Sequence, residues 1–301
     1  MTGYKHPGYA SSLAEFGKPL ELPKCGGWIL KRDIPGTSYF DAMGCYPLFL
    51  CDDWAQLVVD IQNLMGHLIS ITLVTDPFGN YNLSMLEDCF QDMVKPFKQH
   101  YVVDLDLPIL NFVSDHHRRN ARKALQNVAV ELCPEPLNYI DEWVYLYSQL
   151  IEKHQIRGIL RFSREVFTKQ CVVPGIVMLR AIYNGVTVGM VLWYVVGERS
   201  YYHLGAYSPI GYELKASFAL FWRAVEYFVG KVRWLNLGAG SGLDSNVNNG
   251  LSRFKRGWST GTRTAYICGQ ILDPTQYSNI IKSKHIRETD YFPAYRLGEF
   301  D

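Results

Sequence analysis

The chain has 301 residues, with 30 Lys and Arg against 29 Asp and Glu, so its formal net charge is +1. At about 150 residues per domain, this length predicts two domains. A hydrophobic content of 48% with 20% charged residues is typical of a globular protein and excludes intrinsic disorder. The near-zero charge also excludes a bulk polycation, so any site for phosphate or nucleic acid must be local.

The amino-terminal sequence and the cysteines give expectations about location and metals. The first residues lack the apolar core of a secretory signal, and the longest apolar run, residues 186–197, is too short to cross a bilayer. None of the seven cysteines forms a Cys-x-x-Cys pair, so zinc and thioredoxin spacings are absent. We therefore expect a cytoplasmic protein with reduced thiols, no membrane span and no metal.

The first half of the chain alternates between helix-like and strand-like segments. Apolar residues at helical spacing predict one helix, and Ser84 with Glu87 resembles a capping box at the start of another. β-Branched and alternating runs predict the strands between them. In chain order we expect a strand at 28–32, a helix at 53–68, a strand at 69–74, a helix at 84–97, a strand at 101–107 and a basic helix at 114–127.

The second half contains an antiparallel meander. Asn184-Gly185 and Gly197-Glu198-Arg199 are hairpin signals between three strand-like runs. Together with flanking helices, this pattern predicts an α+β fold with mixed, mostly antiparallel sheets. The Cys-Pro-Glu-Pro sequence at 133–136 interrupts regular structure, so we expect domains at 1–130 and 131–301. The expected elements are helices at 137–154 and 163–170, strands at 176–183, 187–196 and 200–207, a helix at 213–229, and strands at 232–237 and 264–269.

The helix at 114–127 is strongly basic. On a helix Arg118 and Arg122 share one face, and Arg119 and Lys123 share another. Such a face can contact phosphate or nucleic acid. A solvated charged face explains the spacing equally simply and is the commoner case, by roughly two to one.

Two glycine-containing turns follow predicted strands. At residues 205–217 a strand leads into a helix, whose free N–H groups and dipole favour an anion, and Lys215 adds a positive charge. The spacing does not match a P-loop, and an ordinary strand–helix turn fits it as well. The second turn, residues 238–242, lacks the Gly-x-Gly-x-x-Gly spacing of a dinucleotide site.

The segment at 250–258 combines three basic and two aromatic residues, and no acidic residue occurs between Asn246 and Arg263. This local positive charge favours an anionic ligand. The sequence contains neither Gly-x-Ser-x-Gly nor His-Glu-x-x-His. His203 is a lone candidate base, although a buried, hydrogen-bonded histidine is the commoner explanation.

These pieces occur in a recognisable order. An Arg-Arg-Asn-x-Arg-Lys-Ala helix precedes a Tyr-Tyr-x-x-Gly-Ala strand, a strand ending in Leu-Gly-Ala-Gly, and the sequence Gly-Leu-x-x-Phe-Lys-x-Gly-Trp. Over about residues 112–270 the chain resembles the FemAB-like branch of the GNAT acyltransferase superfamily, which includes BioF2-like (CelD-like) domains. The matching residues are Arg118, Arg119, Asn120, Arg122, Lys123, Tyr202, Gly205, Gly238, Gly250, Leu251, Phe254, Lys255 and Gly257.

The resemblance implies two tandem GNAT-like domains, of which the first is degenerate and the second holds the transferase site. It implies transfer of an acyl group from acyl-CoA to a small-molecule or peptide amine. Aminoacyl-tRNA, the donor of the peptidoglycan-bridge enzymes, is the alternative. A non-catalytic module that binds phosphate or nucleic acid is a third reading of the same fold.

The resemblance also suggests roles for particular residues. Lys255 would neutralise a donor phosphate or stabilise the oxyanion of the tetrahedral intermediate. Tyr202, His203 and Glu213 are candidates for the base that takes the proton of the amine. Substrate contacts are expected from Arg118, Arg119, Arg122 and Gly238, and acyl-CoA contacts from Gly205, Tyr207, Gly211, Tyr212, Lys215, Ala216, Ser217 and Phe254.

Overall fold

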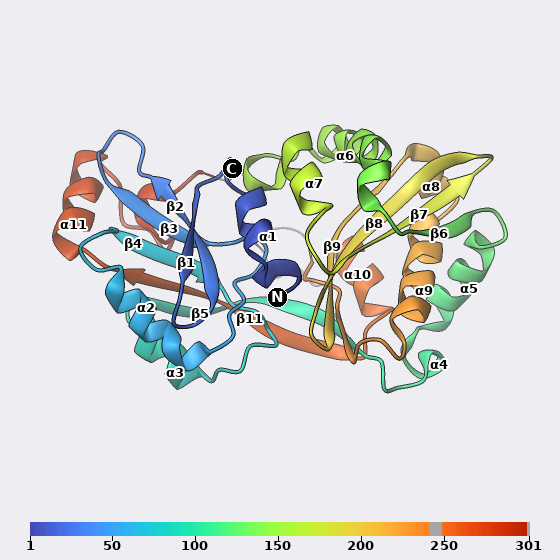
Figure 1. Ribbon diagram of the computed structural model, residues 1–301, viewed down its shortest axis with the longest axis horizontal. Coiled ribbons are helices and arrows are strands. Elements are labelled where there is room, and N and C mark those ends of the chain that lie inside the picture. Colours follow the sequence, from blue (N-terminus) through green and yellow to red (C-terminus); the bar gives the residue numbers. More distant parts are fainter. Residues whose placement is uncertain (241–248, 300–301) are drawn as a thin grey trace. The chain divides into compact units, whose positions relative to one another are not determined.

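The computed structural model describes residues 1–240 and 249–299, which divide into two compact units (Figure 1). Unit 1 comprises Met1–Gly3, Lys98–Ile156 and Arg161–Arg263. Unit 2 comprises Tyr4–Phe97, Arg157–Leu160 and Thr264–Asp301. The predicted division at residue 130 does not coincide with these units, because the basic helix belongs to unit 1 and the last residues belong to unit 2.

The sheet of unit 1 contains the expected meander. Strands β6 (Ala129–Cys133), β7 (Ile176–Tyr183), β8 (Val186–Val196) and β9 (Arg199–Tyr207) pair antiparallel in that order. Strand β10 (Trp234–Asn236) pairs parallel with β9 and antiparallel with the end of β5 (Met93–Asp104). This confirms the α+β class with a mostly antiparallel sheet.

Helices cover both faces of this sheet. Neighbouring residues of a strand point to opposite faces. Trp193 contacts Phe221 of α9 (Ala216–Phe228), whereas the Tyr194 hydroxyl donates to the Gln170 carbonyl at the end of α7 (Arg164–Gln170). The other helices of unit 1 are α4 (Ile109–Phe112), α5 (Asp115–Ala124), α6 (Ile140–His154), α8 (Pro209–Glu213) and α10 (Gly250–Arg256).

Unit 2 has its own set of strands and its own core. Its neighbouring strands are, in order, β1 (Lys18–Leu22), β2 (Gly27–Asp33), β3 (Phe40–Gly44), β4 (Ser70–Val74) and β11 (Gly261–Ile271). Among these neighbours β3 and β4 pair parallel, and the other pairs are antiparallel. Its core gathers apolar residues such as Ile29, Phe49, Leu57 and Ile71. Its helices are α1 (Pro7–Ser12), α2 (Leu57–Asn63), α3 (Leu83–Cys89) and α11 (Pro274–Ser283), with 3₁₀ turns such as Trp54–Gln56 and Ala294–Arg296.

Several predicted boundaries were wrong for identifiable reasons. The helix predicted at 84–97 ends at Cys89, and β5 begins at Met93 and includes Pro96, a residue that cannot continue a helix. The helix predicted at 53–68 ends at Asn63, ahead of Gly66 with its positive φ of 76°. The helix predicted from 213 begins at Ala216, because Lys215 adopts a left-handed φ of 57°. The elements that were not predicted are strands β1, β3 and β6 and helices α1, α4, α8, α10 and α11.

Candidate functional site

Lys255 of α10 is a buried lysine whose ammonium reaches a strand end. Asn249 caps α10 by accepting from the Ser252 amide at 2.8 Å, and Lys255 lies on the covered side of the helix, 5% exposed. Its Nζ donates to the Ala239 carbonyl at 2.6 Å. The adjacent Gly238 has a φ of 75°, and a Cβ there would lie 3.1 Å from Nζ. Glycine therefore serves both the backbone angle and the approach of the lysine.

The surroundings of Lys255 weaken its hold on a proton. Burial, followed by the positive charge of Lys98, lowers the pKa of Lys255 from 10.5 to about 7. The ammonium and the neutral amine are therefore both populated near neutral pH. The oxyanion or phosphate role expected of Lys255 requires the charged form, which a bound anion would favour.

This lysine lies where two parallel strands separate. β10 pairs with β9 only through Trp234–Asn236, opposite Arg199–Tyr201. β9 continues to Tyr207, so its last six residues extend beyond the pairing. Lys255 Nζ is 5.6 Å from the ring centroid of Tyr202, the first of those residues. The backbone of β9 is thus left without a β10 partner beside a titratable amine.

Tyr202 and Tyr207 form a phenol pair over Gly205. The two hydroxyl groups hydrogen-bond to each other, and a Cβ at Gly205 would lie 2.2 Å from the Tyr202 hydroxyl. Burial raises the pKa of both phenols well above the ordinary value. At neutral pH Tyr202 therefore keeps its proton and can donate a hydrogen bond, which does not suit the expected role of base.

The other two expected bases lie in different surroundings. His203 points to the opposite face of the sheet, where Nε2 lies 3.2 Å from Gln170 Oε1 and the ring stacks on Phe162. Burial lowers the pKa of His203 to about 3. Glu213 is exposed at the end of α8. The structure does not bring either side chain together with Lys255.

Four amides of the turn expected to hold the diphosphate of CoA already donate hydrogen bonds within that turn. Ser208 caps α8, accepting from the Gly211 amide at 3.1 Å, and the Tyr212 amide donates to the Ser208 carbonyl at 3.0 Å. The Leu214 and Lys215 amides donate to Ile210 and Tyr212 carbonyls at 2.9 and 3.1 Å. A Cβ at Gly211 would lie 2.0 Å from the Val188 carbonyl oxygen. The glycine is thus explained by packing against β8.

The remaining side chains of this turn are also engaged. Lys215 Nζ donates to Asn120 Oδ1 of α5 at 2.8 Å, and the Tyr212 ring lies 3.5 Å beneath Lys153 Nζ. Ala216 is buried in the first turn of α9, and Ser217 is half-buried beside it. The turn therefore fastens α9 to α5, and its charge and most of its amides serve the fold.

Helices α5 and α10 present arginines and lysines around a packed contact. The Ser114 amide donates to the Gly257 carbonyl at 2.9 Å, and His117 Nε2 lies 2.9 Å from the Phe254 carbonyl oxygen. The ring of Phe254 packs with Phe218, so it is part of the core. Outward from this contact lies what we term the basic face, the exposed side chains of Arg119, Arg122, Lys123, Arg253 and Arg256. Arg118 is more constrained, since it pairs with Asp115 and donates to the Leu110 carbonyl.

The sequence analysis missed two residues beside Lys255. His100 of β5 has its Nδ1 3.0 Å from Asn236 Oδ1, and the same oxygen accepts from the Gly238 amide at 2.8 Å. Burial, together with the charges of Lys255 and Lys98, lowers the pKa of His100 to about 4, against a smaller raising effect of Asn236. The alternation of Lys98 and His100 was a usable strand signal, but the helix predicted through residue 97 obscured it.

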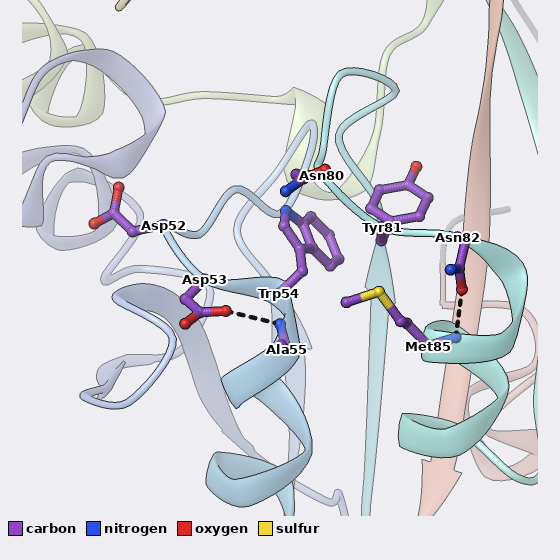
Figure 2. Close-up of a pocket in the computed structure, with 8 residues that line it drawn as sticks. All are labelled: Asp52, Asp53, Trp54, Ala55, Asn80, Tyr81, Asn82 and Met85. Carbon is purple, nitrogen blue, oxygen red and sulfur yellow. Dashed lines mark hydrogen bonds between the residues drawn. The ribbon is translucent and has the colours of Figure 1, made fainter.

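Unit 2 contains a separate hollow of about 290 Å³ that involves none of these residues. Figure 2 shows Trp54 and Tyr81 next to each other in its lining, with ring centroids 4.5 Å apart, and polar side chains around them. Three of those polar groups have structural partners. Asp53 accepts from the Ala55 amide and Asn82 from the Met85 amide, both at 2.9 Å, and Asp52 pairs with Lys5. These three side chains therefore serve helix caps and an ion pair.

Two further searches were confined to the described residues. In that part of the chain no group of three or more His, Cys, Asp or Glu side chains is placed to bind a metal ion. Nor does any helix there combine the length and the apolar character needed to cross a bilayer.

Comparisons with known proteins agree with this architecture. Residues 114–256 match the family model of the acetyltransferase (GNAT) domain, and no curated protein sequence matches the chain. Among solved structures, FemX aligns with a TM-score of 0.68 at 12% identity, covering 91% of this chain and 93% of that one. A DUF2156 domain of a lysylphosphatidylglycerol synthetase from Agrobacterium fabrum aligns at 0.64 and 12% identity, covering 95% and 92%. L-PGS from Bacillus licheniformis aligns at 0.57 and 13%, covering 96% and 99%.

At these identities the solved structures establish the fold alone, and the family model supplies the class. Residues 114–256 form a GNAT-type acetyltransferase domain, and the chain is an acyltransferase with the fold of FemAB-like proteins. The resemblance drawn from the Phe-Lys-x-Gly-aromatic sequence is thereby confirmed. The BioF2-like assignment and the individual site residues stay predictions.

Proposed function

We propose that this chain transfers an aminoacyl group from aminoacyl-tRNA to an amine, at a site around Lys255. The observation that carries the choice of donor is the turn at 208–215. Acyl-CoA binding at the predicted position needs backbone N–H groups aimed at a diphosphate. Here the amides of Gly211, Tyr212, Leu214 and Lys215 already donate within the turn. Opening them would cost the hydrogen bonds that fasten α8.

The distribution of charge supports a long polyanionic donor. The basic face contributes exposed cations from both α5 and α10, two helices in direct contact. RNA is bound largely through its phosphates, so several exposed arginines and lysines suit it better than a single diphosphate does. The net charge of +1 is compatible with this, because the cations are concentrated locally.

The residues around Lys255 suit acyl transfer chemistry. The donor ester carbonyl would lie in the opening between β9 and β10, with the Lys255 ammonium stabilising the oxygen that becomes negative in the tetrahedral intermediate. Tyr202 would donate a second hydrogen bond, since its raised pKa keeps the phenol protonated. The acceptor must arrive as a neutral amine for its lone pair to attack.

Acyl-CoA remains the second candidate donor, because the family model that matches residues 114–256 is described as an acetyltransferase. The separation of β10 from β9 also leaves backbone groups of β9 that a pantetheine amide could pair with. A module that only binds phosphate or nucleic acid, without catalysis, is the third outcome for the test below.

The test compares ligands on the full chain by thermal unfolding. CoA, acetyl-CoA, a long-chain acyl-CoA and total deacylated tRNA are added in turn, at low and high salt. A ligand present at a hundred times its Kd stabilises the fold by roughly 2.7 kcal/mol. We expect stabilisation by tRNA that weakens with salt and none by the CoA compounds. Stabilisation by a CoA compound instead would overturn the choice of donor.

Transfer itself is then followed with total tRNA charged with labelled amino acids and a panel of primary amines. We expect label to appear in an amide product only with the protein present. Binding of tRNA without any product would favour the non-catalytic module. When the same assay is run on a variant of Lys255, the matched control is Lys169→Gln, which removes an exposed cation from α7 in the same unit.

A further inference from the structure

The residues His100, Asn236 and Gly238 form a chain of contacts beside Lys255. Asn236 Oδ1 lies 2.8 Å from the Gly238 amide nitrogen and 3.0 Å from His100 Nδ1. The backbone amide can only donate, which fixes the Asn236 side chain with its oxygen toward Gly238. The reverse orientation would place two donors against each other.

The orientation of Asn236 dictates the tautomer of His100. The amide oxygen is an acceptor only, so the hydrogen bond from Nδ1 requires a hydrogen on Nδ1. A neutral imidazole carries one hydrogen, so Nε2 is left with its lone pair. Within the described residues, His100 Nε2 makes no hydrogen bond. It is also absent from the polar atoms there that are both fully buried and without a partner, so its surface is not completely covered.

The cost of this arrangement indicates that it serves more than the fold. Asn236 is 2% exposed, and its Nδ2 finds no partner among the described residues. An unsatisfied buried donor costs about 1–3 kcal/mol. A leucine at this position would avoid that cost. The asparagine is therefore explained by what its oxygen orients, the His100 ring and the Gly238 amide.

The charges around His100 keep it neutral. Lys98 on β5 and Lys255 on α10 are the charged groups that act on the ring, and both are cations. Both also disfavour protonation of the imidazole until a negative charge arrives. The developing oxyanion of acyl transfer would supply one at Lys255, which is when a proton must leave the amine.

We propose that His100 is the catalytic base of this site, that its Nε2 takes the proton of the attacking amine, and that Asn236 is the positioning residue that keeps Nε2 unprotonated. This inference rests on the proposed function. The amine lone pair forms the C–N bond and the carbonyl π pair moves to oxygen. One N–H proton passes to Nε2. As the C–O bond of the donor ester breaks, the departing ribose oxygen takes that proton back, and His100 is regenerated.

The first experiment reads the tautomer directly and needs no substrate. The full chain is labelled with ¹⁵N-histidine, and the ring nitrogen shifts are recorded, with His100→Gln assigning the resonance. We expect a proton on Nδ1 and none on Nε2 of His100. His203 is the internal comparison, because its Nε2 faces Gln170 Oε1 and is expected to carry the hydrogen. A proton on Nε2 of His100 would overturn the proposal.

Two substitutions of Asn236 separate orientation from stability. In Asn236→Asp the carboxylate still accepts from Gly238 and His100, so the tautomer is kept and the pKa of His100 rises. In Asn236→Leu the acceptor is lost, and we expect a proton to appear on Nε2 in part of the molecules. If the leucine variant does not fold, the aspartate variant alone decides the direction of the pKa change, and an unchanged pKa contradicts the proposal.

The second experiment measures transfer from labelled aminoacyl-tRNA to a primary amine. His100→Gln should lower the rate by on the order of 10²-fold or more, the range for loss of a general base. In Asn236→Asp the acid side of the pH–rate profile should move to higher pH, since the base protonates earlier. A His100→Gln rate equal to wild type would overturn the base while leaving the proposed function intact. Absence of transfer in wild type with every donor would overturn both.

Discussion

Two buried cationic sites, one in each unit, are built in opposite ways. In unit 2, Arg32 and Arg296 are both under 10% exposed and both bind the carboxylate of Asp41, which is fully buried. In unit 1, Lys255 is as deeply buried, and its ammonium donates a hydrogen bond to the Ala239 backbone carbonyl. A paired buried charge stabilises the fold once formed, whereas a buried lysine near other cations gives up its proton.

The pKa values follow the same contrast. Burial disfavours the charge of Arg296, but hydrogen bonds and attraction from Asp41 outweigh it and raise its pKa. Burial and Lys98 together lower the pKa of Lys255 to about 7. A pKa that burial lowers, in a group that lies where two strands separate, is typical of functional sites. The contrast therefore fits a structural role for the arginines and supports the chemical role proposed for the lysine.

The largest effect is expected on removing the carboxylate of the paired site. Asp41→Asn leaves two arginines buried without their buried counter-charge, so the free energy of unfolding should fall by about 3–5 kcal/mol. Denaturant unfolding measures the loss. Glu299→Gln is the control, because Glu299 is 30% exposed and contacts the same arginines, and it should cost less than about 1 kcal/mol. Equal losses in both variants would mean that Asp41 is not the centre of the cluster.

Removing the buried lysine should damage activity and spare the fold. Under the proposed function Lys255→Met removes the group that would stabilise the oxyanion, so transfer from aminoacyl-tRNA should fall by about 10²–10³-fold. The buried methylene chain is largely replaced by the thioether side chain, so unfolding should remain cooperative. Steady-state rates and a denaturant melt on the same sample check both statements. A variant that transfers at the wild-type rate would remove Lys255 from the chemistry.

The lowered pKa of Lys255 predicts how the stability of the same variant, relative to wild type, changes with pH. Lys255 binds its proton less tightly in the folded chain, with a pKa of about 7, than in the unfolded chain, near 10.5. Between these values the unfolded state binds more protons, so this group makes wild-type stability rise with pH. The free energy of unfolding of Lys255→Met, relative to wild type, should therefore be highest at pH 6, and this difference should shrink toward pH 10. Lys231→Met, on an exposed side chain, is the control. If the stability difference between Lys255→Met and wild type grew with pH, it would contradict a lowered pKa of Lys255 in the folded chain.

Local sequence signals were enough for much of the fold and to single out one candidate site residue. Asn184-Gly185 and Gly197 set two hairpins, and the strands around them were predicted almost to the residue. Lys255 became a candidate because it lies in a short, specific sequence, Phe-Lys-x-Gly-aromatic. Both cases depend on residues that are neighbours along the chain.

The rest depended on contacts across the chain. His100 and Asn236 are 136 positions apart, and only the pairing of β5 with β10 brings them together. The turn at 205–217 allowed two interpretations, an anion site or an ordinary strand–helix turn, because a glycine turn before a helix can leave amides free. Ser208 followed by Pro209 was an overlooked sign of a helix start, and the short helix it begins takes up several of those amides.

The smallest predicted effect concerns the basic face and the donor it would contact. Arg119, Arg122 and Lys123 are exposed on α5, whereas Arg118 is held by Asp115. Each phosphate contact contributes about 0.7–0.9 to the slope of log K against log salt. Replacing all three residues by glutamine should therefore lower the magnitude of the tRNA slope by about 2–3, with little change in melting temperature. The matched double variant Arg164→Gln with Lys169→Gln on α7 should leave the slope unchanged, because these cations lie outside the basic face. An unchanged slope in the α5 variant would mean that the face is only solvated, and acyl-CoA would then become the better donor.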